Sequence, residues 1–124
     1  MGRKLDPAKV LRTIVPYPAV FVPNEYGGTD VYFPNFPEAR ASGLRFSLAQ
    51  AAAREELTRQ LYETWREGRR PPPPSAPETL PPDEEEITGT RLLMIEPDQD
   101  RLLIWLGLKK RPWRTSPMGE KYNP

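Results

Sequence analysis

The sequence predicts an α+β protein in which a small antiparallel sheet carries one packed helix. Two runs of strand-forming residues, 17–22 and 29–33, flank a turn that contains two glycines. Apolar residues then recur every fourth position from Ala49 to Trp65, which indicates a long amphipathic helix. A proline-rich stretch separates this helix from two further apolar runs. The expected order is β-β-β-α-β, with an extra C-terminal hairpin strand.

The first three strands follow from alternation and turn chemistry. In the run 29–33, Val31 and Phe33 fall on one face and Asp30 and Tyr32 on the other. The glycines of the preceding turn tolerate positive φ angles, so this turn suits a hairpin. Residues 34–37 contain two prolines and are expected to end the second strand. Residues 39–42 are expected to form a short third strand, closed by glycine.

The helix is expected to span residues 48–67. Its apolar stripe consists of Ala49, Ala53, Leu57, Leu61 and Trp65, with Phe46 just before it. Ser47 and Gln50 have the spacing of a capping box, in which each side chain bonds a free backbone N–H at the start of the helix. Gly68 is a natural C-terminal stop.

Residues 71–82 hold seven prolines and run into four acidic residues at 83–86. This composition indicates an extended spacer, although it would also suit a polyproline ligand. The acidic group at 83–86 has two interpretations: it is part of a solvated linker, or it is a docking patch for a basic partner. Residues 92–95 then read as a strand, 96–100 as a turn and 101–106 as a strand that pairs back on it. The organisation is therefore a basic leader (1–16), a core (17–70), a linker (71–86), a strand pair (87–107) and a basic tail (108–124).

Charge and composition limit the functional classes. The 124 residues carry a net charge of +1, but the leader and the tail are basic and the linker is acidic. Cysteine and histidine are absent, which removes disulfides, thiolate nucleophiles, Cys/His zinc sites and the commonest proton-transfer side chain. No apolar run is long enough to span a bilayer and no signal-like segment opens the chain, so a cytoplasmic protein is expected. The leader is not expected to be well ordered, although Asp6-Pro7 could start a short helix.

Several local motifs, in order, resemble the HicB family of antitoxins. The opening run 17–21, the turn 24–28 and the segment 31–38, Val-Tyr-Phe-Pro-Asn-Phe-Pro-Glu, match the family's pattern in sequence and spacing. Gly43, the alanines and leucines of the helix, Gly68 and the proline-rich exit fall at the family's positions. Asn35 stands where the family usually has aspartate, and Glu38 where it has glycine. The resemblance covers about residues 17–95.

The resemblance implies a fold similar to part of RNase H and a role in a prokaryotic toxin–antitoxin pair. Family members form dimers or larger oligomers and mask the active site of a small, basic, mRNA-cleaving HicA toxin. They act by occlusion, so no catalysis and no cofactor are expected. The family's usual DNA-binding helix pair is not recognisable in residues 96–124.

The candidate functional residues fall into two groups and one rejected set. Partner binding is expected at Tyr17, Phe21, Tyr32, Pro34, Asn35, Phe36, Glu84 and Glu85. Phosphate and base contacts are possible for Lys109, Lys110, Arg111, Trp113 and Arg114, and the alternative function is a freestanding oligomeric regulator that binds nucleic acid through this tail. A metal-dependent nuclease would need clustered acids, and the candidates are Glu25, Asp30, Glu96 and Asp98. Three of these four lie in expected turns, so a structural role is preferred.

Overall fold

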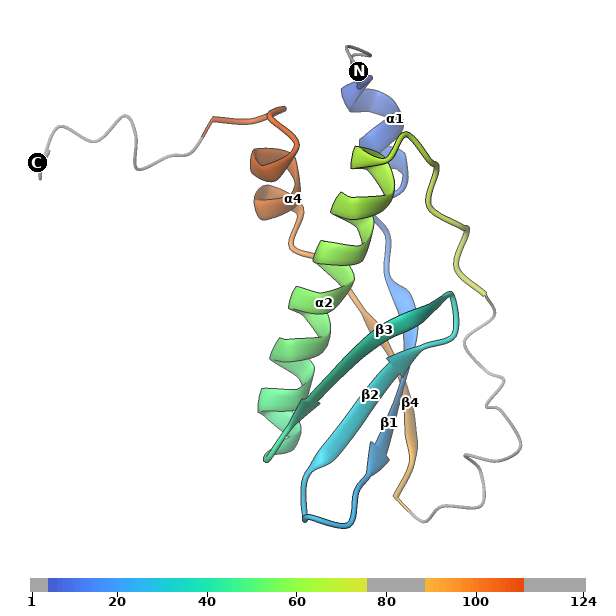
Figure 1. Ribbon diagram of the computed structural model, residues 1–124, viewed down its shortest axis with the longest axis vertical. Helices are drawn as coiled ribbons and strands as arrows, with labels where there is room; N and C mark the ends of the chain where they lie inside the picture. The colour runs from blue at the N-terminus through green and yellow to red at the C-terminus, as the bar shows by residue number, and fades with distance from the viewer. Residues whose placement is uncertain (1–4, 76–88, 111–124) are drawn as a thin grey trace, which may run out of the picture.

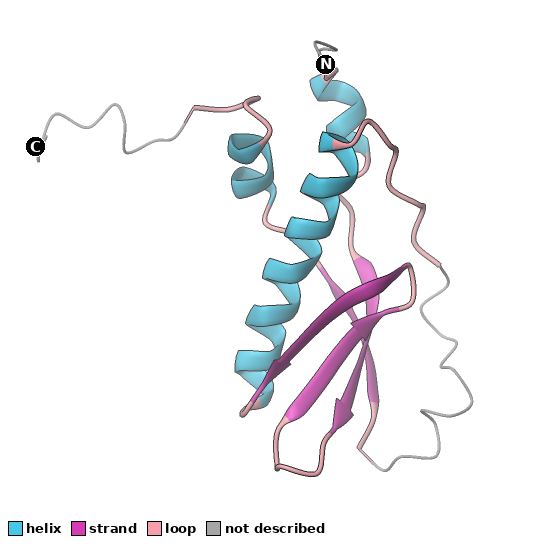
Figure 2. Cartoon of the chain, viewed as in Figure 1, coloured by secondary structure: helices cyan, strands magenta, loops and turns pink. Residues whose placement is uncertain are grey.

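A computed structural model describes residues 5–75 and 89–110 of the chain. Its elements, in order, are α1 (Pro7–Arg12), β1 (Tyr17–Pro23), β2 (Thr29–Phe33), β3 (Phe36–Gly43), α2 (Phe46–Arg66), β4 (Arg91–Ile95) and α4 (Gln99–Trp105). The four strands form one antiparallel sheet in the order β3-β2-β1-β4. In Figure 1, α2 lies along one face of this sheet, and Figure 2 shows α1 and α4 beside α2 at the end away from the β1–β2 turn. The predicted α+β class is confirmed.

The core lies between the sheet and α2. Alternate residues of the strands face the helix, and the predicted separation of Val31 and Phe33 from Asp30 and Tyr32 is confirmed. Ala49, Ala53, Leu57 and Leu61 are fully buried on α2. Two alanines at the start of the stripe allow the backbones of α2 and β3 to come close, and an added Cβ on Gly43 would lie 2.5 Å from the Ala49 nitrogen. Glycine is therefore required at this crossing.

β3 is longer than the sequence predicted. It begins at Phe36, directly after a two-residue turn, and includes Pro37. The proline was expected to end a strand because it has no N–H for the ladder. It is tolerated because β3 is an edge strand of the sheet, so that one side of its backbone pairs with no other described strand.

The predicted capping box of α2 is wrong. The helix begins at Phe46, with Arg45 as its N-cap residue, and no side chain caps this end. Ser47 is therefore already helical and cannot act as the cap. Phe46 explains the early start, because its ring lies 5.1 Å from that of Phe21 and the Arg91 guanidinium stacks 4.2 Å above it. The predicted stop is confirmed: Gly68 has φ +80°, and the next residue donates back to the Thr64 carbonyl.

The predicted strand at 101–106, and with it the C-terminal hairpin, is wrong. Residues 101–105 belong to α4, which packs on α2, and Leu106 is the C-cap residue of this helix. Asp98 caps the helix by accepting a hydrogen bond from the Arg101 N–H at 3.1 Å, and Gly107, with φ +77°, follows its end. The Asp98 N–H donates to Thr58 Oγ1 of α2 at 2.9 Å, which fixes the start of α4 on the long helix.

The described part of the leader, residues 5–16, is more structured than expected. Asp6 caps α1 by accepting from the Ala8 N–H, and Val10 is fully buried. Thr13, just after the helix, accepts a hydrogen bond from the Trp65 indole at 3.1 Å. Trp65, the last member of the predicted stripe, is partly exposed, whereas the four earlier members are buried.

Candidate functional site: the outer face of the sheet and the docked proline segment

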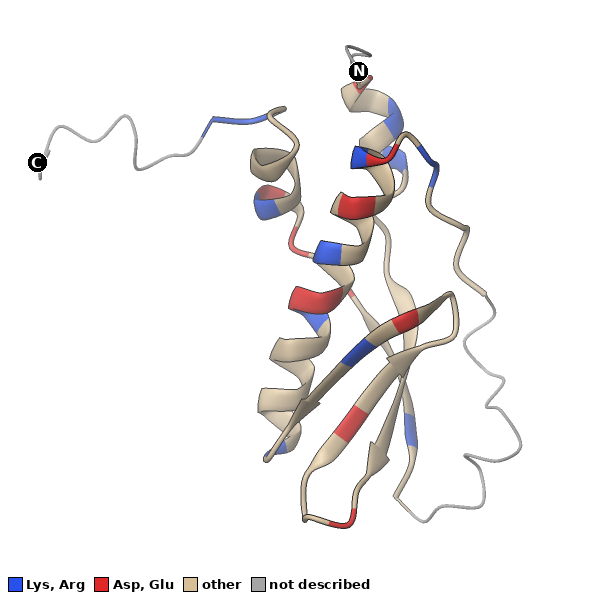
Figure 3. Ribbon diagram, viewed as in Figure 1, with Lys and Arg blue, Asp and Glu red and all other residues tan. Residues whose placement is uncertain are grey.

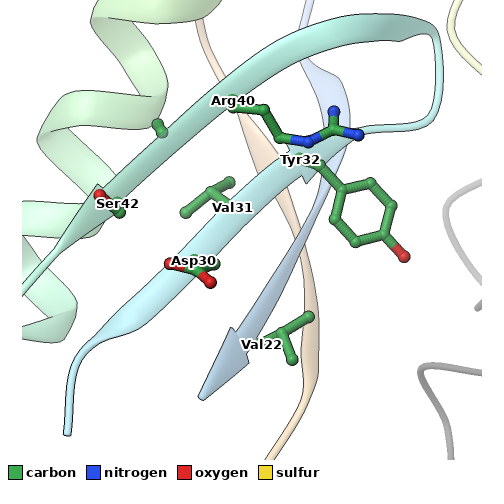
Figure 4. Close-up of a pocket in the computed structure, with 7 residues that line it drawn as sticks. Val22, Asp30, Val31, Tyr32, Arg40 and Ser42 are labelled. Carbon is green, nitrogen blue, oxygen red and sulfur yellow. The ribbon is translucent and has the colours of Figure 1, made fainter. Parts of the chain in front are cut away.

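The face of the sheet opposite α2 carries a shallow depression of about 490 Å³. The side chains that alternate with the core residues line it, and these are Val22, Asp30, Tyr32, Arg40 and Ser42. Figure 4 shows Tyr32 and Arg40 on neighbouring strands, with the guanidinium extending toward the tyrosine ring. The surface thus combines an aromatic ring, aliphatic carbon and one charge of each sign.

Both charges of this surface are held in place by the chain itself. The Arg40 guanidinium lies 5.6 Å from the centre of the Tyr32 ring and donates to the carbonyls of Pro37 and Ala39, each at 2.8 Å. A cation–π contact at an exposed site contributes about 0.5–1 kcal/mol. Asp30 accepts from the Asn24 amide at 3.0 Å. Because these side chains are already ordered, a partner that binds them loses little additional side-chain entropy.

The first residues of the proline-rich segment, 71–75, are hydrogen-bonded across one end of the sheet, and we call them the strap. Asn35, in the β2–β3 turn, donates to the Pro73 carbonyl at 3.2 Å and accepts from the backbone and hydroxyl of Ser75 at 3.1 Å. The Tyr17 hydroxyl donates to the Pro72 carbonyl, and burial raises the pKa of this phenol. Residues 71–75 are therefore attached to the domain. The rest of the linker lies outside the described residues.

A second open depression, of about 500 Å³, lies between this strap and the end of α2. Its lining includes Asn35, Phe36, Glu38, Arg69 and Arg70. Asn35 thus forms hydrogen bonds with the strap and also lines this depression. It connects the β2–β3 turn to the segment that follows α2.

The structure divides the predicted partner-binding residues into buried and accessible sets. Tyr17, Phe21 and Phe36 are buried in the chain's own core, where Tyr17 and Phe36 pack ring to ring at 5.1 Å. Tyr32, Pro34 and Asn35 reach the surface along β2 and its following turn. Glu84 and Glu85 lie outside the described residues. The sequence reasoning missed Arg40, although its position between two alanines of β3 places it on the outer face.

The predicted nucleic-acid residues are only partly described. Lys109 pairs with Asp100 at 2.7 Å, and Lys110 is exposed beside it. Arg111, Trp113 and Arg114 lie outside the described residues. Figure 3 shows that Lys and Arg alternate with Asp and Glu along the outward face of α2, so no single-signed field covers this side of the described chain.

The candidate acids are dispersed. Glu25 and Asp30 lie at the β1–β2 hairpin, whereas Glu96 and Asp98 lie between β4 and α4. Within residues 5–75 and 89–110, no three Asp, Glu, His or Cys side chains gather as a metal site would require. In the same part of the chain, no helix is long and apolar enough to cross a membrane.

Comparison with known proteins gives structural neighbours alone. No family model and no curated protein sequence matches the chain. A chain of a solved HicA3 and HicB3 toxin–antitoxin complex is similar to it, with a TM-score of 0.56 and 26% sequence identity over 68% of this chain and 99% of that one. A chain of a toxin–antitoxin complex from Streptococcus pneumoniae is similar with a TM-score of 0.63 and 21% identity over 79% of this chain and 75% of that one. The chain therefore has a HicB-type, antitoxin-like fold.

Proposed function

We propose that this chain is an antitoxin that binds a small, basic, mRNA-cleaving toxin of the HicA type and blocks it by occlusion, without catalysis. The observation that carries the proposal is the structural match to chains of toxin–antitoxin complexes. The match to the HicA3 and HicB3 complex extends over 99% of the matched chain. Such a protein needs a stoichiometric binding surface and no reactive group. Its site of action would be the cytoplasm, where a toxin that cleaves mRNA meets its substrate.

The outer face of the sheet is the surface we assign to the toxin. α2 occupies the other face, and the outer face presents Tyr32 and Arg40 in fixed positions beside the accessible turn residues Pro34 and Asn35. Tyrosine and arginine are the residue types that most often dominate binding energy, because each combines a large apolar area with directional polar groups. Among the described strands, β3 pairs on one side only, and an extended segment of a partner could add to its other edge.

The test is binding and growth rescue with a HicA-type toxin. The chain is co-expressed with the toxin in cells whose growth the toxin arrests, and the complex is measured by calorimetry. We expect rescue and a one-to-one complex, and we expect Arg40→Glu to weaken it at least about tenfold, as for loss of an interface hot spot. The matched control is Arg54→Glu, an exposed charge reversal on α2, away from this face.

Two results would contradict the proposal at different levels. Failure of the wild-type chain to bind or rescue would reject the antitoxin function with this class of toxin. If binding is unaffected by Arg40→Glu but lost in Arg54→Glu, the antitoxin function stands, and the toxin binds the helical side of the chain instead of the outer face of the sheet.

A further inference from the structure

The pairing of β2 with β3 changes register beside the surface that we assign to the toxin. Arg40 lies opposite Tyr32, and Phe36 lies opposite Phe33. β3 therefore advances by four residues where β2 advances by one, and residues 37–39 have no opposite residue on β2. We call residues 37–39 the β3 bulge. An extra residue in one strand of a pair bends that strand and re-aims its side chains, so the bulge decides where these three side chains lie.

The backbone of the β3 bulge is held on both sides of its central residue, Glu38. Arg40 Nη1 donates to the carbonyls of Pro37 and Ala39, each at 2.8 Å. Ala39 is fully buried, and Phe36, which precedes the bulge, is buried as well. The ring of Pro37 also fixes its own φ angle. Glu38 therefore extends from a backbone that is already ordered, and only its side chain has to be fixed when a partner binds.

The Glu38 carboxylate is exposed and has no charge partner in the part of the chain that the structure describes. Arg40, the nearest cation along the chain, directs Nη1 at the bulge carbonyls instead. Arg69 and Arg70 line the same depression as Glu38, but Arg69 pairs with Glu67 and neither pairs with Glu38. A negative charge thus remains available on β3, two residues from Arg40.

We propose that Glu38 pairs with a lysine or arginine at the rim of the toxin interface and selects a basic toxin during encounter. This inference rests on the proposed antitoxin function and adds a specificity-determining residue to the same surface. A charge at a solvated rim affects the rate of association and the choice of partner more than the final affinity. Glu38 therefore steers and selects the toxin, whereas Tyr32 and Arg40 hold the complex together.

Stopped-flow association of the full chain with a fluorescently labelled HicA-type toxin tests this role. Glu38→Lys should slow association at least about threefold at low salt. At high salt the difference should disappear because the charges are screened, and the dissociation rate should change less than about twofold at either salt concentration. The matched control is Glu25→Lys, the same charge reversal of an exposed carboxylate at the opposite end of β2, and it should change association much less. Glu38→Gln should give a smaller loss in the same direction, and it decides the question if the charge reversal disturbs the fold.

A charge swap identifies the partner residue. The exposed lysines and arginines of the toxin are changed to glutamate one at a time, and one such variant should restore fast association with Glu38→Lys. Equal slowing by Glu38→Lys and Glu25→Lys would mean that net charge alone matters, and it would overturn the role of Glu38. Unchanged association of both Glu38 variants, in a complex that the wild type forms, would overturn it as well and leave the antitoxin function intact. If the wild-type chain does not bind the toxin, the antitoxin function is rejected and this inference falls with it.

Discussion

Replacement of Leu57 by alanine tests the packing of α2 on the sheet most directly. The side chain is fully buried in the middle of the helix and belongs to the core cluster. Truncation removes three carbons, worth about 2.4 kcal/mol at roughly 0.8 kcal/mol each. A residual cavity of about 40 Å³ would add about 1 kcal/mol at roughly 24 cal/mol per Å³. The higher helix propensity of alanine offsets only about 0.2 kcal/mol of this loss in the free energy of unfolding. The expected loss is therefore about 3 kcal/mol.

Urea unfolding followed by circular dichroism measures this loss. With a slope near 1 kcal/mol per molar urea, typical of a small domain, the midpoint should fall by about 3 M. Leu48→Ala is the matched control on the same helix, because Leu48 is 53% exposed and should cost under about 1 kcal/mol. A loss below about 0.5 kcal/mol for Leu57→Ala would show that α2 does not cover this core.

Four other outcomes follow from single features of the structure. Gly43→Ala should cost about 3 kcal/mol in urea unfolding, since its Cβ would meet the α2 backbone, whereas Gly27→Ala, with φ +85° and open space, should cost only about 1 kcal/mol. Burial raises the pKa of Tyr17, so its stabilising effect is complete below about pH 10 and is lost as the pH rises through the raised pKa. Between pH 8 and 11, the free energy of unfolding should therefore fall less steeply with pH in Tyr17→Phe than in the wild type. Asp98→Ala should cost about 1 kcal/mol through loss of the α4 cap, and an unchanged melting curve would contradict that role. If the tail binds phosphates, deletion of residues 108–124 should flatten the salt dependence of any nucleic-acid binding, and an unchanged slope would remove the tail from that role.

The elements that periodicity defines could be predicted from the sequence. The strict spacing of the α2 stripe and the alternation in β2 specify which side chains face inward, and both agree with the structure. The run 101–106 has no periodicity, because an unbroken apolar segment fits a strand and a short helix equally well. The deciding signals were Asp98 before it and Gly107 after it, a cap and a stop that suit a helix alone.

The candidate site was less predictable because it depends on which face of a strand points outward. Tyr17, Ala19 and Phe21 are alternate residues of β1, so all three side chains face α2. The two aromatic residues therefore serve core packing. Tyr32 has the opposite orientation on β2 and meets Arg40 only through the β2–β3 register, which no local pattern specifies. The docking of Pro72 and Pro73 is likewise a long-range contact. Proline content predicts an extended segment but not the surface on which it lies.

The sheet order has a consequence for how the chain acquires its structure during synthesis. β1 is central, and its two neighbours come from very different distances along the chain: β2 follows after a short turn, whereas Tyr17 lies opposite Ile95. Local pairings close small loops and form early, while distant pairings must first overcome the entropy of a long loop. The hairpin, β3 and α2 can therefore assemble on the ribosome while one edge of β1 is still open. β4 and α4 close that edge last, so the newly made chain passes through a stage in which a strand edge is available to any other unpaired strand.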